Sequence, residues 1–133
     1  MNIKQGQRAY YRNAPATALA SIDAPQLQVS TKLEGVFEYI HLFTTTQNDL
    51  DTQLRKLTEH LAPTGRLWVS WPKAGQLETD LAIASVIRIG YTHSLVESTC
   101  LRIDDVWSGL KFTHPKPGKS YNNSYGTLPS QQD

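Results

Sequence analysis

The sequence has little cysteine, no long apolar run and almost no net charge, and each shortage excludes a class of protein. A single cysteine, Cys100, among 133 residues rules out an intramolecular disulfide framework and fits a reducing compartment. The apolar runs are only a few residues long, whereas a membrane-spanning helix needs about 20. The formal net charge of +1 predicts no long-range attraction to nucleic acid or to an anionic membrane. We therefore expect a cytoplasmic protein with neither partner.

The composition is that of a globular protein with one core. Its 39% hydrophobic and 19% charged residues are ordinary values, and 133 residues are too few for two cores. We predict a single domain over residues 1–114. After residue 114 proline, glycine, serine, asparagine and glutamine replace the apolar pattern, which predicts a flexible tail over residues 115–133.

Strand-like runs alternate with helical patterns along this domain. Strands are expected over residues 7–12, 27–30, 36–43, 67–71, 95–103 and 107–113. Helices are expected over residues 15–22, 48–61 and 78–89, the last with Thr79 as its cap and Gly90 as its left-handed stop. This order predicts a small, three-layer, Rossmann-like α/β domain. Its mostly parallel sheet would end in an antiparallel hairpin.

Two stretches of the chain carry a family resemblance. The strand Phe37-Glu38-Tyr39-Ile40, the following helix and the turn Leu61-Ala62-Pro63-Thr64-Gly65 resemble the second half of a class I S-adenosylmethionine-dependent methyltransferase. The blocks Trp68-Val69-Ser70-Trp71-Pro72-Lys73 and Trp107-Ser108-Gly109-Leu110-Lys111-Phe112 resemble a family of short bacterial proteins of unknown function, which look like trimmed methyltransferase domains. The resemblance covers about residues 6–113. It implies a fold without an established activity.

The chain departs from the methyltransferase pattern where the cofactor would bind. The turn after the first strand, Arg12-Asn13-Ala14-Pro15-Ala16-Thr17, has no glycine that would let the backbone approach a ligand closely. The end of the second strand, Ser30-Thr31-Lys32, offers no acidic residue for the ribose hydroxyls. We therefore expect no cofactor, S-adenosylmethionine included, and no methyl transfer.

Ligands of open parallel sheets bind beyond the carboxyl ends of the strands. The candidate binding residues near that edge are Asn13, Thr45, Ser70, Trp71, Lys73, Asp80, Asp105, Trp107 and Ser108. They predict a small anionic or aromatic ligand, with Lys73 as the charge, Trp71 as a stacking face and helix N-termini as further donors. The alternative is structural: Lys73 would pair with Asp80, Asp104 or Asp105, and the tryptophans would fill the core.

Other chemistry has weaker support. The four histidines lie on separate elements without metal-ligand spacing, so no metal site is predicted. No histidine is expected near the candidate edge, and Ser70 and Ser108 lack a Gly-x-Ser-x-Gly elbow. Three functions stay open. They are non-catalytic binding of a ligand or partner, a transferase with an atypical cofactor site near Lys73, and an interaction subunit that pairs through the strand at 95–103 with another copy or protein.

Overall fold

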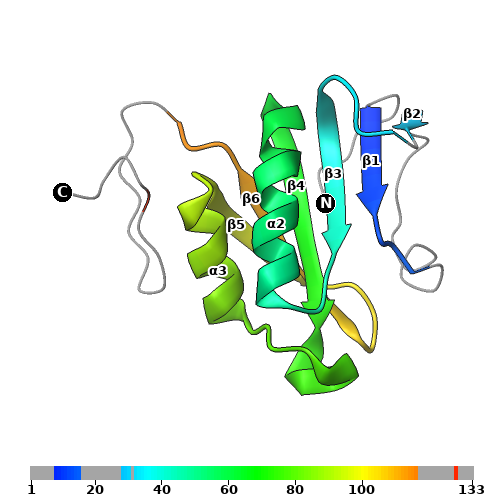
Figure 1. The fold of residues 1–133 in the computed structure, drawn as a ribbon, viewed down its shortest axis with the longest axis vertical. Coiled ribbons are helices and arrows are strands. Elements are labelled where there is room, and N and C mark those ends of the chain that lie inside the picture. The colour runs from blue at the N-terminus through cyan, green and yellow to red at the C-terminus, as the bar shows by residue number, and fades with distance from the viewer. Residues whose placement is uncertain (1–7, 16–27, 31, 117–127, 129–133) are drawn as a thin grey trace.

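The fold is a mixed six-stranded sheet with the strand order β2-β1-β3-β4-β6-β5 (Figure 1). The computed structural model describes residues 8–15, 28–30, 32–116 and 128. The strands are β1 (Arg8–Arg12), β2 (Gln28–Ser30), β3 (Phe37–Phe43), β4 (Leu61–Pro72), β5 (Val96–Arg102) and β6 (Trp107–Thr113). The first four are parallel, and β6 runs antiparallel to both β4 and β5. The predicted fold class and the terminal hairpin are confirmed.

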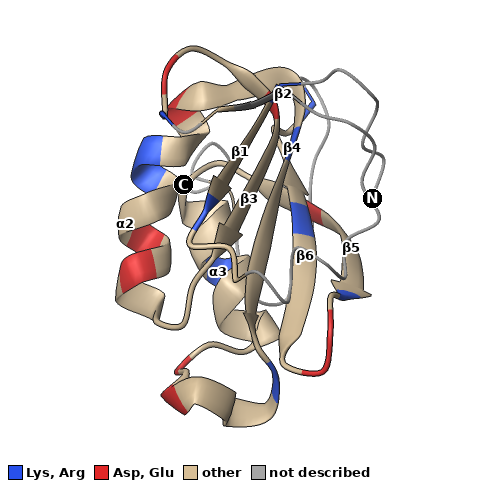
Figure 2. Ribbon diagram, turned by 90° about the vertical axis from the view of Figure 1, so that its right-hand side faces the viewer, with Lys and Arg blue, Asp and Glu red and all other residues tan. Residues whose placement is uncertain are grey.

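Both described α-helices lie on one face of this sheet (Figures 1 and 2). They are α2 (Gln47–Leu57), which continues into the 3₁₀ turn η1 (Thr58–His60), and α3 (Ile83–Thr92). The apolar stripe of α2 that the leucine spacing predicted is buried at Leu50, Leu54 and Leu57. The expected helix over residues 15–22 lies almost wholly outside the described residues.

The strand β4 is longer than the sequence predicted. It begins at Leu61, which pairs with Phe37, and the register resumes with Arg66 opposite Tyr39. Residues 62–65 therefore form a bulge within the strand, where the sequence predicted the stop of the preceding helix. Glycine fits at position 65 because a Cβ there would lie only 3.1 Å from the backbone N and O of Ala62.

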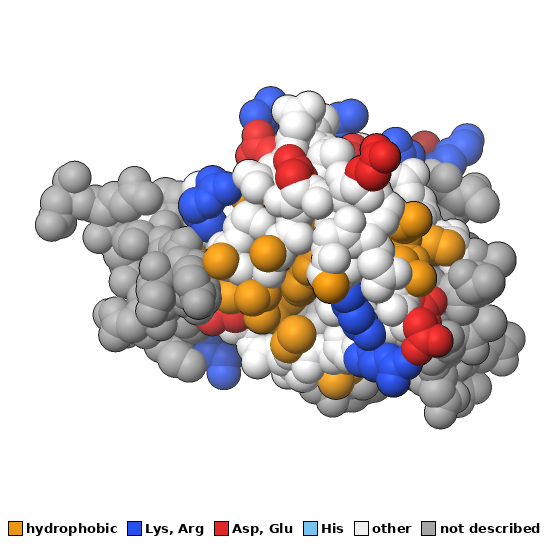
Figure 3. All heavy atoms as spheres, turned by 90° about the horizontal axis from the view of Figure 1, so that it is seen from below, with side chains coloured by type: hydrophobic (Ala, Val, Ile, Leu, Met, Phe, Trp, Pro, Cys, Tyr) orange, Lys and Arg blue, Asp and Glu red, His pale blue; other side chains and the backbone are white. Residues whose placement is uncertain are grey.

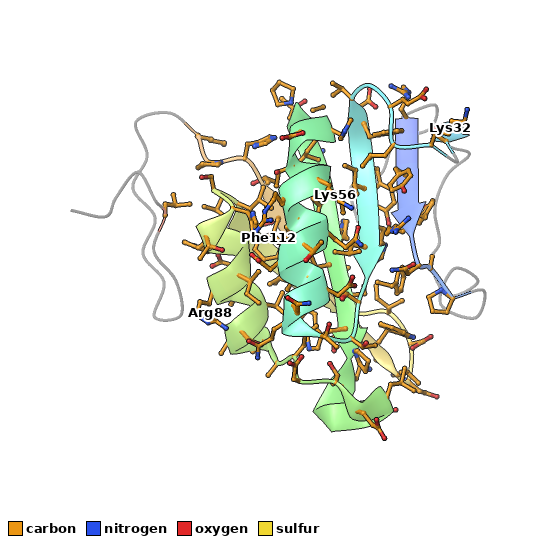
Figure 4. All side chains as sticks on the ribbon, in the orientation of Figure 1. Lys32, Lys56, Arg88 and Phe112 are labelled. Atoms are coloured by element: carbon orange, nitrogen blue, oxygen red, sulfur yellow. The ribbon has the colours of Figure 1, made fainter. Side chains whose placement is uncertain are left out.

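The predicted ends of the second helix are both wrong. The segment Lys73–Glu78 forms the 3₁₀ element η2, and α3 begins only after Ala82. Gly90 lies inside α3, where a Cβ would come within 2.2 Å of the Phe112 ring. Phe112 lies between α2 and α3 in the view of Figure 4. Gly90 is thus required for close packing of helix on sheet, and the left-handed residue is Ser94, with φ of 61°.

One described residue of the predicted tail is part of the core. Leu128 is only 2% exposed and belongs to the main apolar cluster between helices and sheet. Residues 117–127 and 129–133 lie outside the described part of the chain. At Leu128 the chain is packed against the domain.

The two faces of the sheet have different chemistry. The helix face presents aliphatic and aromatic side chains without hydrogen-bonding needs, among them Ile40, Leu42, Leu67, Val69 and Phe112. The opposite face, called here the aromatic face, carries Tyr39, His41, Phe43, Trp68, Ser70 and Trp107. Each of these side chains is at least nine-tenths buried.

Candidate functional site

The carboxyl ends of β1, β3 and β4 meet at one edge of the sheet, at the bottom of Figure 1. This carboxyl rim consists of residues 13–15, 44–46, 72–82 and 103–108. Asn13, Thr45 and Lys73 follow directly or closely after these three strands, as the sequence predicted. Because β6 is antiparallel, Trp107 and Ser108 begin their strand at the same edge.

Lys73 anchors the turn between β5 and β6. Its Nζ donates to the Asp104 carbonyl oxygen at 2.6 Å, and its backbone N–H donates to the Val106 carbonyl oxygen at 2.7 Å. The Asp104 carboxylate is occupied by the backbone N–H groups of Val106 and Trp107, at 2.9 and 2.8 Å. Lys73 therefore contacts Asp104, one of its three predicted partners, through the backbone carbonyl oxygen and not through the carboxylate. It forms no ion pair within the described residues.

The two rim tryptophans lie on opposite faces of the sheet. Trp71 pairs with Ser108 across the β4–β6 ladder and is buried in the helix-face core. Trp107 packs edge-on against Phe43, with ring centroids 5.2 Å apart, on the aromatic face. Both tryptophans lie at the predicted edge, but Trp107 is opposite Pro72, the residue next to Trp71, so the two side chains point to opposite faces of the sheet.

The N-terminus of α2 is capped by the chain itself. The Gln47 N–H donates to Asp80 Oδ1 at 2.8 Å, and the Asp49 N–H donates to Thr46 Oγ1 at 3.1 Å. The expectation that this helix end offers free donors to an anionic ligand is wrong, since a carboxylate of the chain already occupies it. Thr45 is tied down as well, because its carbonyl accepts from Thr79 Oγ1 at 2.6 Å.

A buried polar chain crosses the aromatic face beneath this rim. Ser70 Oγ lies 2.7 Å from His41 Nε2, and His41 Nδ1 lies 2.7 Å from the Tyr39 hydroxyl. The Tyr39 ring in turn packs edge-on against Tyr11, with ring centroids 5.5 Å apart. Nearby, Trp68 Nε1 is buried and has no hydrogen-bond partner in the described part of the chain. The three strands β1, β3 and β4 are thus joined by side chains as well as by their backbone ladder.

Burial keeps this chain of groups neutral. It lowers the pKa of His41 to about 3, because the enclosed ring loses the hydration of its charged form. Burial likewise raises the pKa of the Tyr39 and Tyr11 hydroxyls. His41 and Ser70 are both 0% exposed. The pair therefore fixes β3 against β4 and does not present a nucleophile to solvent.

Sequence reasoning missed this network. The sequence does not indicate a hydrogen-bonding partner for His41, because Ser70 lies 29 residues further along the chain. The available signal was period-two alternation: Tyr39, His41 and Phe43 share one face of β3, and Trp68 and Ser70 share the same face of β4.

The pockets of the described surface include one at each end of β4. One, of about 390 Å³, is lined at the carboxyl rim by Arg102, Ile103, Asp104 and Asp105, and there Arg102 forms an ion pair with Asp105. The other, of about 280 Å³, lies at the opposite end of β4, beside the bulge. Within the described residues no group of histidine, cysteine and acidic side chains is arranged to hold a metal ion. No described helix is long and apolar enough to cross a membrane.

Known proteins resemble this chain in fold only. No protein-family model and no curated protein sequence matches it. Its structure is similar to the crystal structure of the ribosomal protein L11 methylase from Lactobacillus delbrueckii subsp. bulgaricus, with a TM-score of 0.57 and 11% sequence identity. The match covers 86% of this chain and 73% of that chain. The chain is therefore a Rossmann-like, methyltransferase-like α/β domain.

Proposed function

We propose that this domain is a non-catalytic binding module that docks a protein partner on its carboxyl rim and does not use S-adenosylmethionine. The observation that carries the proposal is the exposure of Leu77 and Ile83. These large apolar side chains are 60% and 42% exposed; Leu77 belongs to the segment 73–82 that crosses the rim, and Ile83 begins α3 directly after it.

The segment 73–82 is held in place from both sides. Besides the two bonds of Lys73, Gln76 Nε2 donates to the Asp105 carbonyl oxygen at 3.3 Å. On the other side, Thr79 and Asp80 are hydrogen-bonded to the ends of β3 and α2. Three non-glycine residues, Ala74, Leu77 and Glu78, adopt left-handed φ angles of 50–55°. A conformation that costs energy at several positions is typical of a functional surface.

A preformed apolar surface suits a protein partner. Seen from below in Figure 3, hydrophobic side chains gather near the middle of this end, with charged side chains around them. Burying one large aliphatic side chain contributes about 1.5–3 kcal/mol. Because the segment is already ordered by its own hydrogen bonds, little conformational entropy would be lost on docking.

Several features support binding without S-adenosylmethionine. The turn after β1 has Asn13, with φ of 59°, where a cofactor-binding domain has glycines. Ala14 packs on the apolar cluster of Phe43, Ile103 and Trp107 at the rim. The polar groups that could hold a small ligand there are already bonded within the chain.

Specific observations also favour two other functions, methyl transfer and pairing through β5. Methyl transfer is favoured by the fold shared with a methylase. Pairing through β5 is favoured by its place at the sheet edge and by the exposure of residues 98–102. The register of β5 is shifted between Glu97 and Cys100, however, and such a bulge interrupts the ladder that a further strand would need. The rim is therefore the stronger candidate.

The test compares two variants with acidic side chains at opposite ends of the sheet. Leu77→Asp with Ile83→Asp alters the rim, and Val36→Asp, at a site 48% exposed before β3, is the matched control. Each protein is used to co-purify partners from the source cells, and the captured protein is then purified for affinity measurement. We expect the rim variant to bind the captured protein about 100-fold more weakly than the wild type does, because two apolar contacts are lost. The control variant should bind it with nearly the wild-type affinity.

Equal affinity of the rim variant and the control for that partner contradicts docking at the rim. The cofactor is tested separately by thermal unfolding with S-adenosylmethionine. We expect no increase in melting temperature, whereas a saturable increase establishes cofactor binding and overturns the proposal of a cofactor-free module.

A further inference from the structure

The pocket of about 280 Å³ beside the bulge lies at the end of β4 opposite the rim. It is lined by Pro63, Thr64, Gly65 and Arg66 of β4 and by Thr113, His114 and Lys116 at the end of β6. The bulge creates the hollow, because residues 62–65 leave the ladder between β3 and β4. This site is independent of the proposed partner surface, which lies at the other end of the strands.

Arg66 is the central charge of this pocket. Among the described residues its buried Nε has no hydrogen-bond partner, and its NH1 reaches only the Thr64 carbonyl oxygen, at 3.4 Å. The ion pairs of the described residues join Asp51 to Arg55 and His93, and Asp105 to Arg102, so none neutralises Arg66. A partly buried guanidinium without a counter-charge is costly, and an anion would remove that cost.

A second cation lies on the same face of the sheet. Lys111 pairs with Trp68 across the β4–β6 ladder, which places it diagonally next to Arg66. Burial and the nearby positive charge of Arg66 lower the pKa of Lys111. Figure 2 shows the basic segment on the ribbon of β6. Two like charges therefore lie together, with no ion pair to either in the described chain.

His114 completes the polar lining. Its Nε2 donates to the Leu61 carbonyl oxygen at 3.1 Å, which holds the ring beside the bulge.

We infer that this pocket binds a small phosphate group, either inorganic phosphate or a small phosphomonoester, through Arg66, with Lys111 beside Arg66 as a second positive charge. The planar fork of an arginine side chain matches the oxygen atoms of a phosphate, and a lysine adds a point charge. The volume is just below the roughly 300 Å³ at which ordinary small-molecule sites begin. It therefore favours a compact anion over a dinucleotide.

The experiment follows the backbone amide signals of the full chain by NMR while inorganic phosphate or glycerol phosphate is added at constant ionic strength. We expect saturable shifts around Arg66 and His114 and an increase in melting temperature. Arg66→Gln should weaken the affinity about tenfold or more, because it removes a charge-assisted hydrogen bond. Tighter binding of glycerol phosphate identifies a phosphomonoester, and equal binding identifies the bare anion.

Matched controls come from the outer face of α2. Arg55→Gln and Lys56→Gln change exposed cations there, with Lys56 labelled in Figure 4, and should leave phosphate affinity unchanged. If Arg66→Gln fails to fold, Lys111→Gln carries the same test. Absence of saturable shifts at millimolar phosphate, or an equal loss in the α2 controls, overturns the inference.

Discussion

The helix face and the aromatic face of the sheet are both buried, yet they are stabilised in different ways. The helix face consists of apolar side chains such as Leu67 and Val69, packed against α2 and α3. The aromatic face includes His41 and Ser70, which satisfy each other by hydrogen bonds. The stability of the helix face therefore depends on the amount of apolar surface removed from water. The stability of the aromatic face depends also on the protonation state of the His41 imidazole.

The largest effect is expected on the helix face. Leu54→Ala removes a side chain that is 0% exposed from the centre of the α2 stripe and leaves a cavity. We expect a loss of about 3 kcal/mol in the free energy of unfolding, measured by urea denaturation at pH 7. The loss should not depend on pH between 5 and 7. A cost below about 1 kcal/mol would show that this face is loosely packed.

The aromatic face should respond to pH. The pKa of His41 is about 3 in the folded chain against an ordinary value of 6.5. Between these values the unfolded chain binds a proton that the folded chain does not, so stability falls as pH falls. The expected slope is about 1.4 kcal/mol per pH unit, or about 2 kcal/mol from pH 6.5 to pH 5.

The variant His41→Gln separates the contribution of His41 to the pH dependence of stability from that of the other titrating groups. Glutamine keeps hydrogen-bonding groups but does not titrate, so the difference in unfolding free energy between wild type and variant should narrow as the pH is lowered. A constant difference between pH 6.5 and pH 5 would show that His41 takes up a proton in the folded chain, and the account of a neutral buried network would then be wrong.

Two adjacent residues provide a finer comparison. Val69 faces the helices and Ser70 faces His41. Val69→Thr puts an unpaired hydroxyl into the apolar face, and Ser70→Ala leaves the imidazole without one partner. Each should cost about 1–2 kcal/mol in thermal or urea unfolding, the first from burying a hydroxyl and the second from losing a bond. If Ser70→Ala leaves the free energy of unfolding unchanged, the Ser70 hydroxyl does not stabilise the network.

The smallest effect is expected where the two faces end, at the rim. Lys73→Met removes the ammonium group that holds the turn at Asp104 but keeps a long apolar stem. Because Lys73 is only half-buried, we expect a loss of about 1 kcal/mol. Thermal unfolding of the wild type and of Lys73→Met measures this loss. The same measurement with inorganic phosphate tests where the anion binds. If phosphate raises the melting temperature of the wild type but not that of Lys73→Met, the anion site lies at the rim.

The elements that sequence analysis predicted well have strong local patterns. The leucine spacing identified α2, and the β-branched and aromatic runs identified β3 and the hairpin β5–β6. Where local signals were ambiguous, the prediction was wrong. Thr79 and Gly90 are good helix-boundary residues by type, but hydrogen bonding to Thr45 and packing on Phe112 determined their actual roles.

The candidate site was predicted less well than the fold. The sequence indicated that Lys73, Asp105 and Trp107 approach one edge, because strand order and direction follow from the pattern of elements. It did not indicate what these groups contact. Lys73 binds a backbone carbonyl, and backbone groups are present at every position, so no residue type marks such a partner.

The sequence by itself determined the class of fold, since apolar periodicity must be buried and only a few α/β arrangements bury it. Only the tertiary structure determined which polar groups are satisfied within the chain. It joined His41 to Ser70 across two strands, and it left Arg66 in a pocket without a counter-charge in the described chain. The physical reason is that hydrogen bonds and charges act over a few ångströms in space, whereas distance along the sequence says little about which groups meet.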